Sequence, residues 1–230
     1  AFNQYYEHDL DPLMARTRTR PFVTGEIKHG PVWLVIIAAL TVLSVGAAWI
    51  ALNAWSALFV FLGAFFYAIV YTVWLKRRTW LNIVFGGLAG SWAVLAGAAA
   101  ADPHLGAVPL ALAFVLFLWT PPHFWSLAIA FREDYKAAGV PMLPVVVGDQ
   151  RAAQTIFYST LALVAASFLP LAFGLGPIYA IGAAAGGFLF IQKAWRLAQE
   201  PTRKTAMACF FSSLVQLTLV LLAAIIDARL

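Results

Sequence analysis

Charged side chains are scarce in this sequence: Asp, Glu, Lys and Arg make up 11% of its 230 residues, whereas hydrophobic residues make up 63%. Soluble domains have about 25% charged residues, which supply the polar faces of their surface helices. The long apolar segments of this sequence have almost no polar faces. The composition therefore argues against a soluble helical core and favours a membrane protein.

Cysteine is nearly absent as well. The single residue, Cys209, lies inside an apolar segment. An intrachain disulfide is therefore excluded, and the cysteine content gives no information on the redox compartment. Because no repeat, low-complexity segment or linker divides the chain, we expect residues 1–230 to form a single domain.

A signal peptide is also lacking, since no charged start is followed by an apolar middle and a cleavage site. The chain instead opens with Ala1-Phe2 and a polar segment. We therefore expect residues 1–11 to be the cytoplasmic end of a membrane span that starts before Ala1.

Long apolar runs, in contrast, are abundant. A helix of about 20 residues crosses a bilayer. Seven runs have roughly that length: Val32–Leu52, Ala57–Leu75, Leu81–Ala100, Ala107–Phe131, Ala153–Leu175, Ile178–Ala194 and Ala206–Ile226. The sequence therefore predicts an all-α fold, a polytopic transmembrane helical bundle.

The basic residues give the orientation of this bundle. Of the 15 Lys and Arg, all but Arg229 lie before the first run or in the connections after the second, fourth and sixth runs. By the positive-inside rule these segments face the cytoplasm, or the matrix of a mitochondrion. We expect a bacterial inner membrane, or the mitochondrial inner membrane in a eukaryote. Topology thus explains the pI of about 9.6, and no nucleic-acid partner is needed.

The segment Asn3–Pro21 combines acids, an amide and arginines. Asn3, Glu7 and Asp11 are four residues apart and would share one face of a helix, and Arg16 and Arg20 follow at the same spacing. Oxygen ligands beside guanidinium groups suit a metal ion and a phosphate. On a helix Asn3 and Asp11 would lie roughly 12 Å apart, too far for one Mg²⁺. The alternative is an exposed polar helix end that leads into a basic loop.

Two later connections on the same side add polar side chains. Lys76, Arg77 and Arg78 follow the run that ends near Tyr71, where they either bind a ligand or only anchor the topology. The connection after the fourth run begins with Arg132, Glu133, Asp134, Tyr135 and Lys136. We expect it to complete a second half-site that faces the first. We assign no chemistry to the final connection.

The fourth run contains two prolines and a histidine. Pro121 and Pro122 remove backbone donors and should kink or break the helix. His123 lies about 13 Å inside the cytoplasmic end, and an ionisable residue at that depth is a functional candidate. It could ligate a metal centre, move a proton or hydrogen-bond a freed carbonyl.

Aromatic rings flank this histidine. They belong to Trp119, Phe124 and Trp125. Their faces could stabilise a carbocation, although aromatic residues in a span also serve simply as packing. An allylic diphosphate fits the whole pattern, since Mg²⁺ and arginines would neutralise the charge that builds on the leaving group. The hydrocarbon tail would lie among the spans.

Four motifs resemble those of the UbiA superfamily of intramembrane prenyltransferases, and within it those of the protohaem IX farnesyltransferases (haem O synthases). They are NxxxExxxD with MARTRTRP (residues 3–21), YT with LKRRT and NI (71–83), WTPPHFW (119–125) and DYKAAGVPMLP (134–144). Three positions depart from the family pattern. Glu7 replaces an Asp, Ala138 replaces the second acid of a DxxxD motif, and Trp92-Ala93 replaces Pro-Pro, which could reshape the cavity.

The resemblance implies a fold and a reaction. The family has nine transmembrane helices around a central cavity, so the first and most of the second would precede Ala1. The implied reaction transfers a farnesyl group from farnesyl diphosphate to a vinyl group of haem B, giving haem O and diphosphate, with Mg²⁺ as cofactor. The lipid bilayer is a partner, and haem A synthase and self-association are further candidates.

The resemblance also implies roles for individual residues. Asn3, Glu7 and Asp11 would bind Mg²⁺-diphosphate, and Arg16, Arg20, Lys76 and Arg77 would hold the phosphates. Asp134, Tyr135 and Lys136 would close the site. His123 would meet the haem, and the remaining substrate-binding candidates are Tyr71, Trp119 and Trp125.

Two other functions stay open at this point. One is a prenyltransferase that acts on an aromatic or quinone precursor. The other is a membrane transporter with a central anion site, although the extracytoplasmic connections have almost no polar groups for a second gate.

Overall fold

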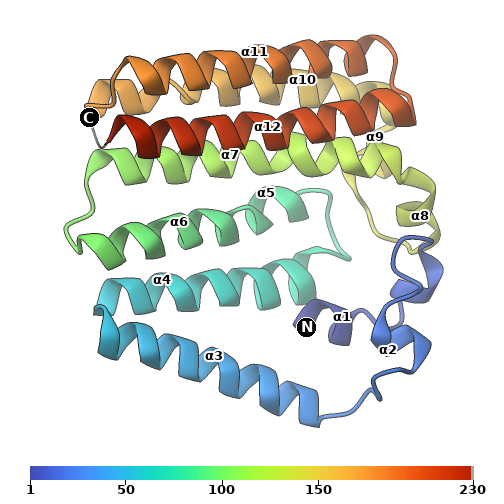
Figure 1. Ribbon diagram of the computed structural model, residues 1–230. Helices are drawn as coiled ribbons and strands as arrows, with labels where there is room; N and C mark the ends of the chain where they lie inside the picture. Colours follow the sequence, from blue (N-terminus) through green and yellow to red (C-terminus); the bar gives the residue numbers. More distant parts are fainter. Residues whose placement is uncertain (229–230) are drawn as a thin grey trace. The chain divides into compact units, whose positions relative to one another are not determined.

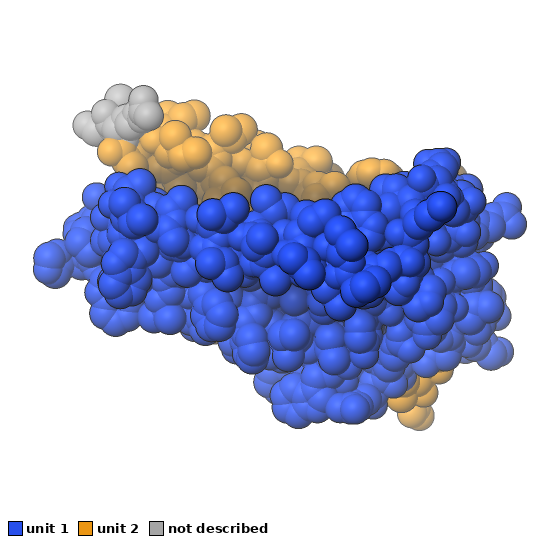
Figure 2. All heavy atoms as spheres, turned by 90° about the horizontal axis from the view of Figure 1, so that it is seen from below, with its two compact units in different colours: residues 1–104, 132–142 blue, residues 105–131, 143–230 orange. Residues whose placement is uncertain are grey.

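The computed structural model describes residues 1–228, and within this range the secondary structure is helical, without strands. The chain forms two compact units (Figure 2). Unit 1 comprises Ala1–His104 and Arg132–Met142, and unit 2 comprises Leu105–Phe131 and Leu143–Leu230. The single domain expected from the sequence stays a prediction.

Unit 1 contains the helices α3, α4 and α6, joined to several shorter elements (Figure 1). Its elements are α1 (Phe2–Tyr6), η1 (Asp11–Leu13), α2 (Pro21–Thr24), α3 (Val32–Ala51), α4 (Ala54–Phe65), η2 (Phe66–Leu75), α5 (Asn82–Gly86), α6 (Leu88–Ala101) and α8 (Arg132–Ala137). Helix α4 packs against both α3 and α6. Asn53 fixes this arrangement, because its Oδ1 accepts from the Ser56 N–H at 2.9 Å while its Nδ2 donates to the Ala99 carbonyl at 2.6 Å.

The helix that begins with α4 continues as a π-helix, η2, which ends at the polar cluster described below. Its wider turn appears in bonds that span five residues, from the Thr72 hydroxyl to the Tyr67 carbonyl and from the Lys76 N–H to the Tyr71 carbonyl. Gly86 makes room for the Tyr71 ring, since a Cβ there would lie 2.7 Å from a ring carbon. The π-helix therefore sets the position from which Lys76 leaves the span.

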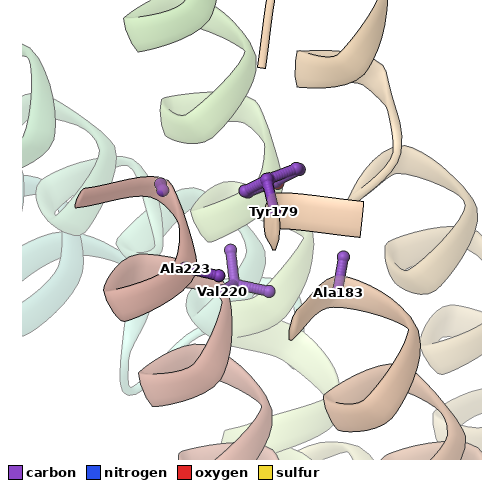
Figure 3. Close-up of a cluster of buried hydrophobic side chains, with 5 residues drawn as sticks. Tyr179, Ala183, Val220 and Ala223 are labelled. Carbon is purple, nitrogen blue, oxygen red and sulfur yellow. The ribbon is translucent and has the colours of Figure 1, made fainter. Parts of the chain in front are cut away.

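Unit 2 is built from four long helices, α7 (Ala107–Ala130), α10 (Asp149–Ala166), α11 (Pro177–Gln199) and α12 (Arg203–Asp227), with the short α9 (Leu143–Val147) and η3 (Leu169–Phe173). The long helices lie side by side, α7 against α10 and α12, and α11 against α10 and α12 (Figure 1). Tyr179 and Ala183 of α11 meet Val220 and Ala223 of α12 in the core (Figure 3). Small residues allow this close contact of backbones.

Two glycines of α11 show how close the approach is. A Cβ on Gly182 would lie 2.5 Å from the Ala223 Cβ, and a Cβ on Gly186 would lie 2.9 Å from the Gln216 Cα. Any larger side chain at either position would push α11 and α12 apart. The same helices are joined at one end by Asp227, whose carboxylate accepts from the N–H groups of Gly176, Ile178 and Tyr179. It thereby satisfies orphan donors at the start of α11.

Helix α7 corrects one expectation. It runs unbroken from Ala107 to Ala130 with Pro121 and Pro122 inside it. Both prolines are buried among protein atoms, which is the setting in which a membrane helix tolerates proline. The prolines therefore do not end the span, although the carbonyls four residues before them lose their helical donors.

Each of the seven predicted runs lies largely in helical structure. Six helices of the described residues are long and apolar enough to cross a membrane: Val32–Ala51, Ala54–Leu75, Asn82–Ala101, Ala107–Ala130, Asp149–Phe173 and Arg203–Asp227. The remaining predicted run, Ile178–Ala194, lies in α11, which is 23 residues long. Its centre consists of Gly and Ala, and its end carries Gln192 and Lys193, so α11 is less apolar than its neighbours.

Candidate active site

The polar cluster at the beginning of unit 1 forms because the chain does not continue as one helix. Helix α1 ends at Tyr6, and the turn after it leads into η1. The backbone leaves the α-helical conformation at Glu7, which has φ −100° and ψ 18°. The Thr17 hydroxyl donates to the Asp11 carbonyl at 3.0 Å and holds the next turn against this one.

The turn brings the two ends of the NxxxExxxD motif together. Arg20 Nη1 donates to both carboxylate oxygens of Asp11 at 2.9 Å and lies 3.4 Å from the amide oxygen of Asn3. Because one nitrogen reaches both residues, Asn3 and Asp11 converge instead of standing a helix turn or more apart. The expected separation of about 12 Å was wrong, since it assumed a continuous helix.

The middle acid of the motif has its own cation. Lys76, at the end of η2, places its Nζ 2.5 Å from Glu7 Oε1. Glu7 and Asp11 are each only 2% exposed, and a carboxylate this deeply buried is costly unless it is paired. Burial lowers the pKa of Lys76, and the charge of Glu7 opposes that shift. Lys76 also lies 5.7 Å above the Tyr71 ring, so Tyr71 borders the cluster.

Helix α8 contributes Tyr135 to the same cluster. Its hydroxyl lies near enough to Arg16 for that cation to affect its pKa, and the residue is 7% exposed. Burial raises the pKa of Tyr135, and the negative charge of Glu7 adds to this rise. The positive charges of Arg16 and Arg20 oppose it. Residues of the polar segment Asn3–Pro21 and of the connection that begins with Arg132 therefore belong to the same unit.

Asp134 and Lys136, on either side of Tyr135, differ in burial and in the partners open to them. Asp134 has a buried Oδ2 for which the described residues supply no hydrogen-bond donor. Lys136 is exposed and forms no ion pair within the described part of the chain. Asp134 thus offers an unused acceptor, whereas Lys136 is free to reach a ligand from solvent.

Arg77 pairs with an acid that the motif analysis missed. Its Nη1 and Nη2 each lie 2.8 Å from an oxygen of Asp9, and its guanidinium lies 5.3 Å from the centre of the Tyr6 ring. The hydrogen bond from Arg77 lowers the pKa of Asp9, and Asp9 raises the pKa of Arg77. Asp9 falls outside the four-residue spacing, so the sequence pattern gave no signal for it.

The donor set fits a magnesium ion. Asn3, Glu7 and Asp11 offer an amide oxygen and two carboxylates, which are the ligands Mg²⁺ prefers, and two of the three converge on one point. The described residues contain no group of three or more His, Cys, Asp or Glu side chains placed to hold a metal. An ion here would therefore use the amide of Asn3, phosphate oxygens or water alongside the carboxylates.

The remaining predicted residues belong to unit 2. His123 is 5% exposed in the middle of α7 and lies between the rings of Trp119 and Phe210, with centroids 4.0 and 4.4 Å away. Phe124 meets it edge-on at 4.8 Å. Trp125 is buried, 4% exposed. Phe210 was not predicted, because it lies 87 positions along the chain in an otherwise ordinary apolar run.

The fold and the cluster define a class of protein: an all-helical integral membrane protein with buried acids paired to cations at the end of a span. The model of the UbiA prenyltransferase family matches residues 1–215. The chain belongs to this family, and it is a prenyltransferase.

Curated relatives are similar over nearly the whole chain. Protoheme IX farnesyltransferase 2 of Paramagnetospirillum magneticum is 57% identical over 230 residues, which are 100% of this chain and 80% of the relative. Protoheme IX farnesyltransferase 1 of Cenarchaeum symbiosum is 43% identical over 228 residues, 99% of this chain and 77% of the relative.

Solved structures agree in fold. A structure of digeranylgeranylglyceryl phosphate synthase has a TM-score of 0.79 at 22% identity and covers 100% of this chain and 80% of that one. The apo structure of a UbiA homologue from Aeropyrum pernix K1 has a TM-score of 0.73 at 20% identity, with 96% and 82% covered. At these identities the likeness supports the fold alone.

Proposed function

We propose that this chain transfers the farnesyl group of farnesyl diphosphate to a vinyl group of haem B, giving haem O and diphosphate, in a bacterial inner membrane. The observation that carries the proposal is the cluster in which two buried acids, Glu7 and Asp11, are paired with Lys76 and Arg20. The choice of haem rests on the names of the relatives and on the four motifs.

The cations of the cluster would bind the diphosphate. In the ligand-free arrangement Arg20 and Lys76 neutralise acids, and Arg16 lies near the Tyr135 hydroxyl. A diphosphate is a stronger anion than any of these partners and forms charge-assisted hydrogen bonds with guanidinium groups. We infer that Arg16, Arg20 and Lys76 turn from their present partners toward the phosphate oxygens.

Freed from their cations, the acids would hold a metal. Asn3, Glu7 and Asp11 would bind Mg²⁺, which when bound adds positive charge beside the diphosphate. The unused oxygen of Asp134 is a further acceptor of the same unit. The cluster would thus exchange internal ion pairs for a complex of the same residues with Mg²⁺-diphosphate.

The first chemical step is ionisation of the substrate. The bond between C1 of the farnesyl group and the phosphate oxygen breaks, and its electron pair stays with diphosphate. Arg16, Arg20 and Lys76 would stabilise the charge that develops on that oxygen, a stronger interaction at a dry site than in water. The farnesyl cation would remain among apolar residues, away from bulk water.

The second step forms the new carbon–carbon bond. The π electrons of a haem vinyl group bond to C1 of the farnesyl cation, which leaves a cation on the vinyl carbon next to the porphyrin. A water molecule adds to this carbon and loses one proton, so the product carries a hydroxyl. Aromatic faces such as those around His123 are suited to stabilise such cations.

The test is product analysis with membranes that contain the protein. Incubation with haem B, farnesyl diphosphate and Mg²⁺ should give a porphyrin heavier by one farnesyl group and one hydroxyl group, by mass spectrometry. Arg20→Ala should abolish most of this product. Farnesylation of a hydroxybenzoate but not of haem would overturn the proposal, and so would substrate flux into liposomes without any product.

A further inference from the structure

The imidazole of His123 is held on both faces by aromatic rings. The ring of Trp119 lies 4.0 Å away at 20° and the ring of Phe210 lies 4.4 Å away at 26°. Two nearly parallel rings this close cannot share one face, so they cover opposite faces. A ligand can therefore reach the imidazole only through its edge, in the plane of the two ring nitrogens.

One of these nitrogens is already engaged. His123 Nδ1 lies 2.6 Å from the hydroxyl oxygen of Ser213 on α12, and the same oxygen lies 2.6 Å from the carbonyl oxygen of Phe210. A hydroxyl has one proton and two lone pairs. Two oxygens at 2.6 Å repel each other unless that proton lies between them. The Ser213 hydroxyl therefore donates to Phe210, and it must accept from His123.

This assignment fixes the tautomer of the imidazole. The proton of neutral His123 sits on Nδ1, and Nε2 carries the lone pair. The described residues provide no hydrogen bond to Nε2, and His123 donates none to the carbonyls that Pro121 and Pro122 leave without donors. The structural role considered for His123, as a donor to those carbonyls, has no support in the geometry.

A second contact locks α12 to α7 at the same level. The indole N–H of Trp119 donates to the Ser213 carbonyl at 2.9 Å. Ser213 is thus joined to α7 through both its side chain and its backbone. The position of its hydroxyl relative to the imidazole is fixed by the packing of the two helices, and it does not depend on a flexible side chain.

We propose that Ser213 is a positioning residue, which holds His123 in the Nδ1–H form so that Nε2 binds the iron of the substrate haem B. The inference rests on the proposed function. Imidazole binds metals through a nitrogen lone pair in the ring plane, and a hydrogen bond from the other nitrogen sets its direction and basicity. The bond formed is a coordinate bond, so no group is transferred and no electron is gained or lost.

The test measures haem binding without farnesyl diphosphate. The purified protein is titrated with haem B in detergent, and the absorption and electron paramagnetic resonance spectra are recorded. The wild type should give a histidine-ligated spectrum, which His123→Ala should lose and added imidazole should restore. Ser213→Ala should weaken haem binding about 10- to 100-fold and shift the spectrum, whereas Ser213→Thr should keep the wild-type signature.

Ser126→Ala is the matched control. Ser126 lies one turn after His123 on α7, is fully buried, and its hydroxyl donates to the His123 backbone carbonyl at 2.7 Å. Its removal deletes a buried hydroxyl bonded to His123 but leaves the imidazole bond intact. Its haem spectrum should therefore match the wild type.

The outcomes separate this inference from the proposed function. If the wild type farnesylates haem but His123→Ala or Ser213→Ala leaves the haem spectrum and affinity unchanged, the inference is wrong and the function stands. A Ser126→Ala effect equal to that of Ser213→Ala also overturns it, because the effect would then be one of packing. A wild type that neither binds nor farnesylates haem overturns both.

Discussion

In unit 1 the buried carboxylates of Glu7 and Asp11 are each neutralised by a cationic side chain, whereas in unit 2 the buried imidazole of His123 hydrogen-bonds a neutral hydroxyl. Both arrangements satisfy polar groups that would be costly to bury alone. They differ in what can replace the partner. An ion pair can exchange one anion for another, and the cluster of unit 1 is therefore suited to admit a diphosphate.

The neutral hydrogen bonds around His123 in unit 2 cannot exchange partners in this way. The link from His123 through Ser213 to the Phe210 carbonyl has no charge to exchange, and aromatic rings fix the imidazole from both sides. Such a site holds one geometry and one protonation pattern. Under the proposed function, the difference would suit the two units to different tasks, one to bind and release an anion and the other to present a fixed nitrogen.

Arg20→Ala should have the largest effect on activity. The guanidinium contacts both Asn3 and Asp11, and removal of a donor that stabilises developing charge costs about 100-fold or more in turnover. The measurement is the rate of porphyrin farnesylation at saturating farnesyl diphosphate. Arg18→Ala, an exposed arginine of the same segment, should retain activity. Equal rates for the two variants would remove Arg20 from the phosphate site.

Lys76→Met tests whether the ion pair of Lys76 and Glu7 is needed for stability. Glu7 would keep its charge at a position 2% exposed without a cation, and breaking a buried pair costs roughly 3 kcal/mol of stability. Thermal unfolding in detergent should show a clear loss, which Glu7→Gln in the same protein should partly restore. Lys28→Met, at an exposed lysine, should be neutral. A single variant as stable as the wild type would contradict the argument.

Asp227→Asn tests a carboxylate that accepts from backbone N–H groups. Asp227 accepts from three backbone N–H groups at the start of α11, so the amide should cost about 1–2 kcal/mol through lost charge-assisted bonds and lost interaction with the helix dipole. Unit 2 should loosen where α11 meets α12, measured by hydrogen exchange of the first turn of α11. Asp102→Asn, an exposed aspartate, should change little. No faster exchange at α11 would show that the cap is not needed.

The sequence predicted those features that depend on local patterns. Long apolar runs identified the spans of both units, and the spacing of Asn3, Glu7 and Asp11 identified the acids of the cluster. It failed where the backbone leaves the helical conformation at Glu7, inside the segment expected to be one helix. The apolar signal of α11 is the weakest of the long helices of unit 2, because its glycines reduce hydropathy while they allow close packing against α12.

Partners far apart in the chain were beyond any local pattern. Asp9 and Arg77 are 68 residues apart, and His123 and Ser213 are 90 residues apart. Nothing in the composition around Asp9 or Ser213 distinguishes them from other polar residues near a membrane. Only the folded helices decide which aspartate meets the arginine and which serine meets the imidazole.

The ion pair of Asp9 and Arg77 should have the smallest effect on stability. Its dependence on pH and salt tests the contrast between the ion pairs of unit 1 and the neutral hydrogen bond of unit 2. Arg77 lowers the folded pKa of Asp9 below its ordinary 3.8. Such a group contributes stability that is present above the unfolded pKa and is lost as the pH falls through the folded pKa. Their side chains are 49% and 35% exposed, so solvent screening limits the coupling to about 0.5 kcal/mol.

A double-mutant cycle of Asp9→Asn and Arg77→Met should therefore show weak coupling near neutral pH, which disappears in acid and at high salt. The same cycle with His123→Ala and Ser213→Ala should give a coupling that salt does not change, because neither group is charged in the assigned tautomer. Salt screens charges and leaves a buried neutral hydrogen bond as it is. If salt weakened both couplings equally, His123 would carry a charge, and the contrast between an exchangeable and a fixed site would be lost.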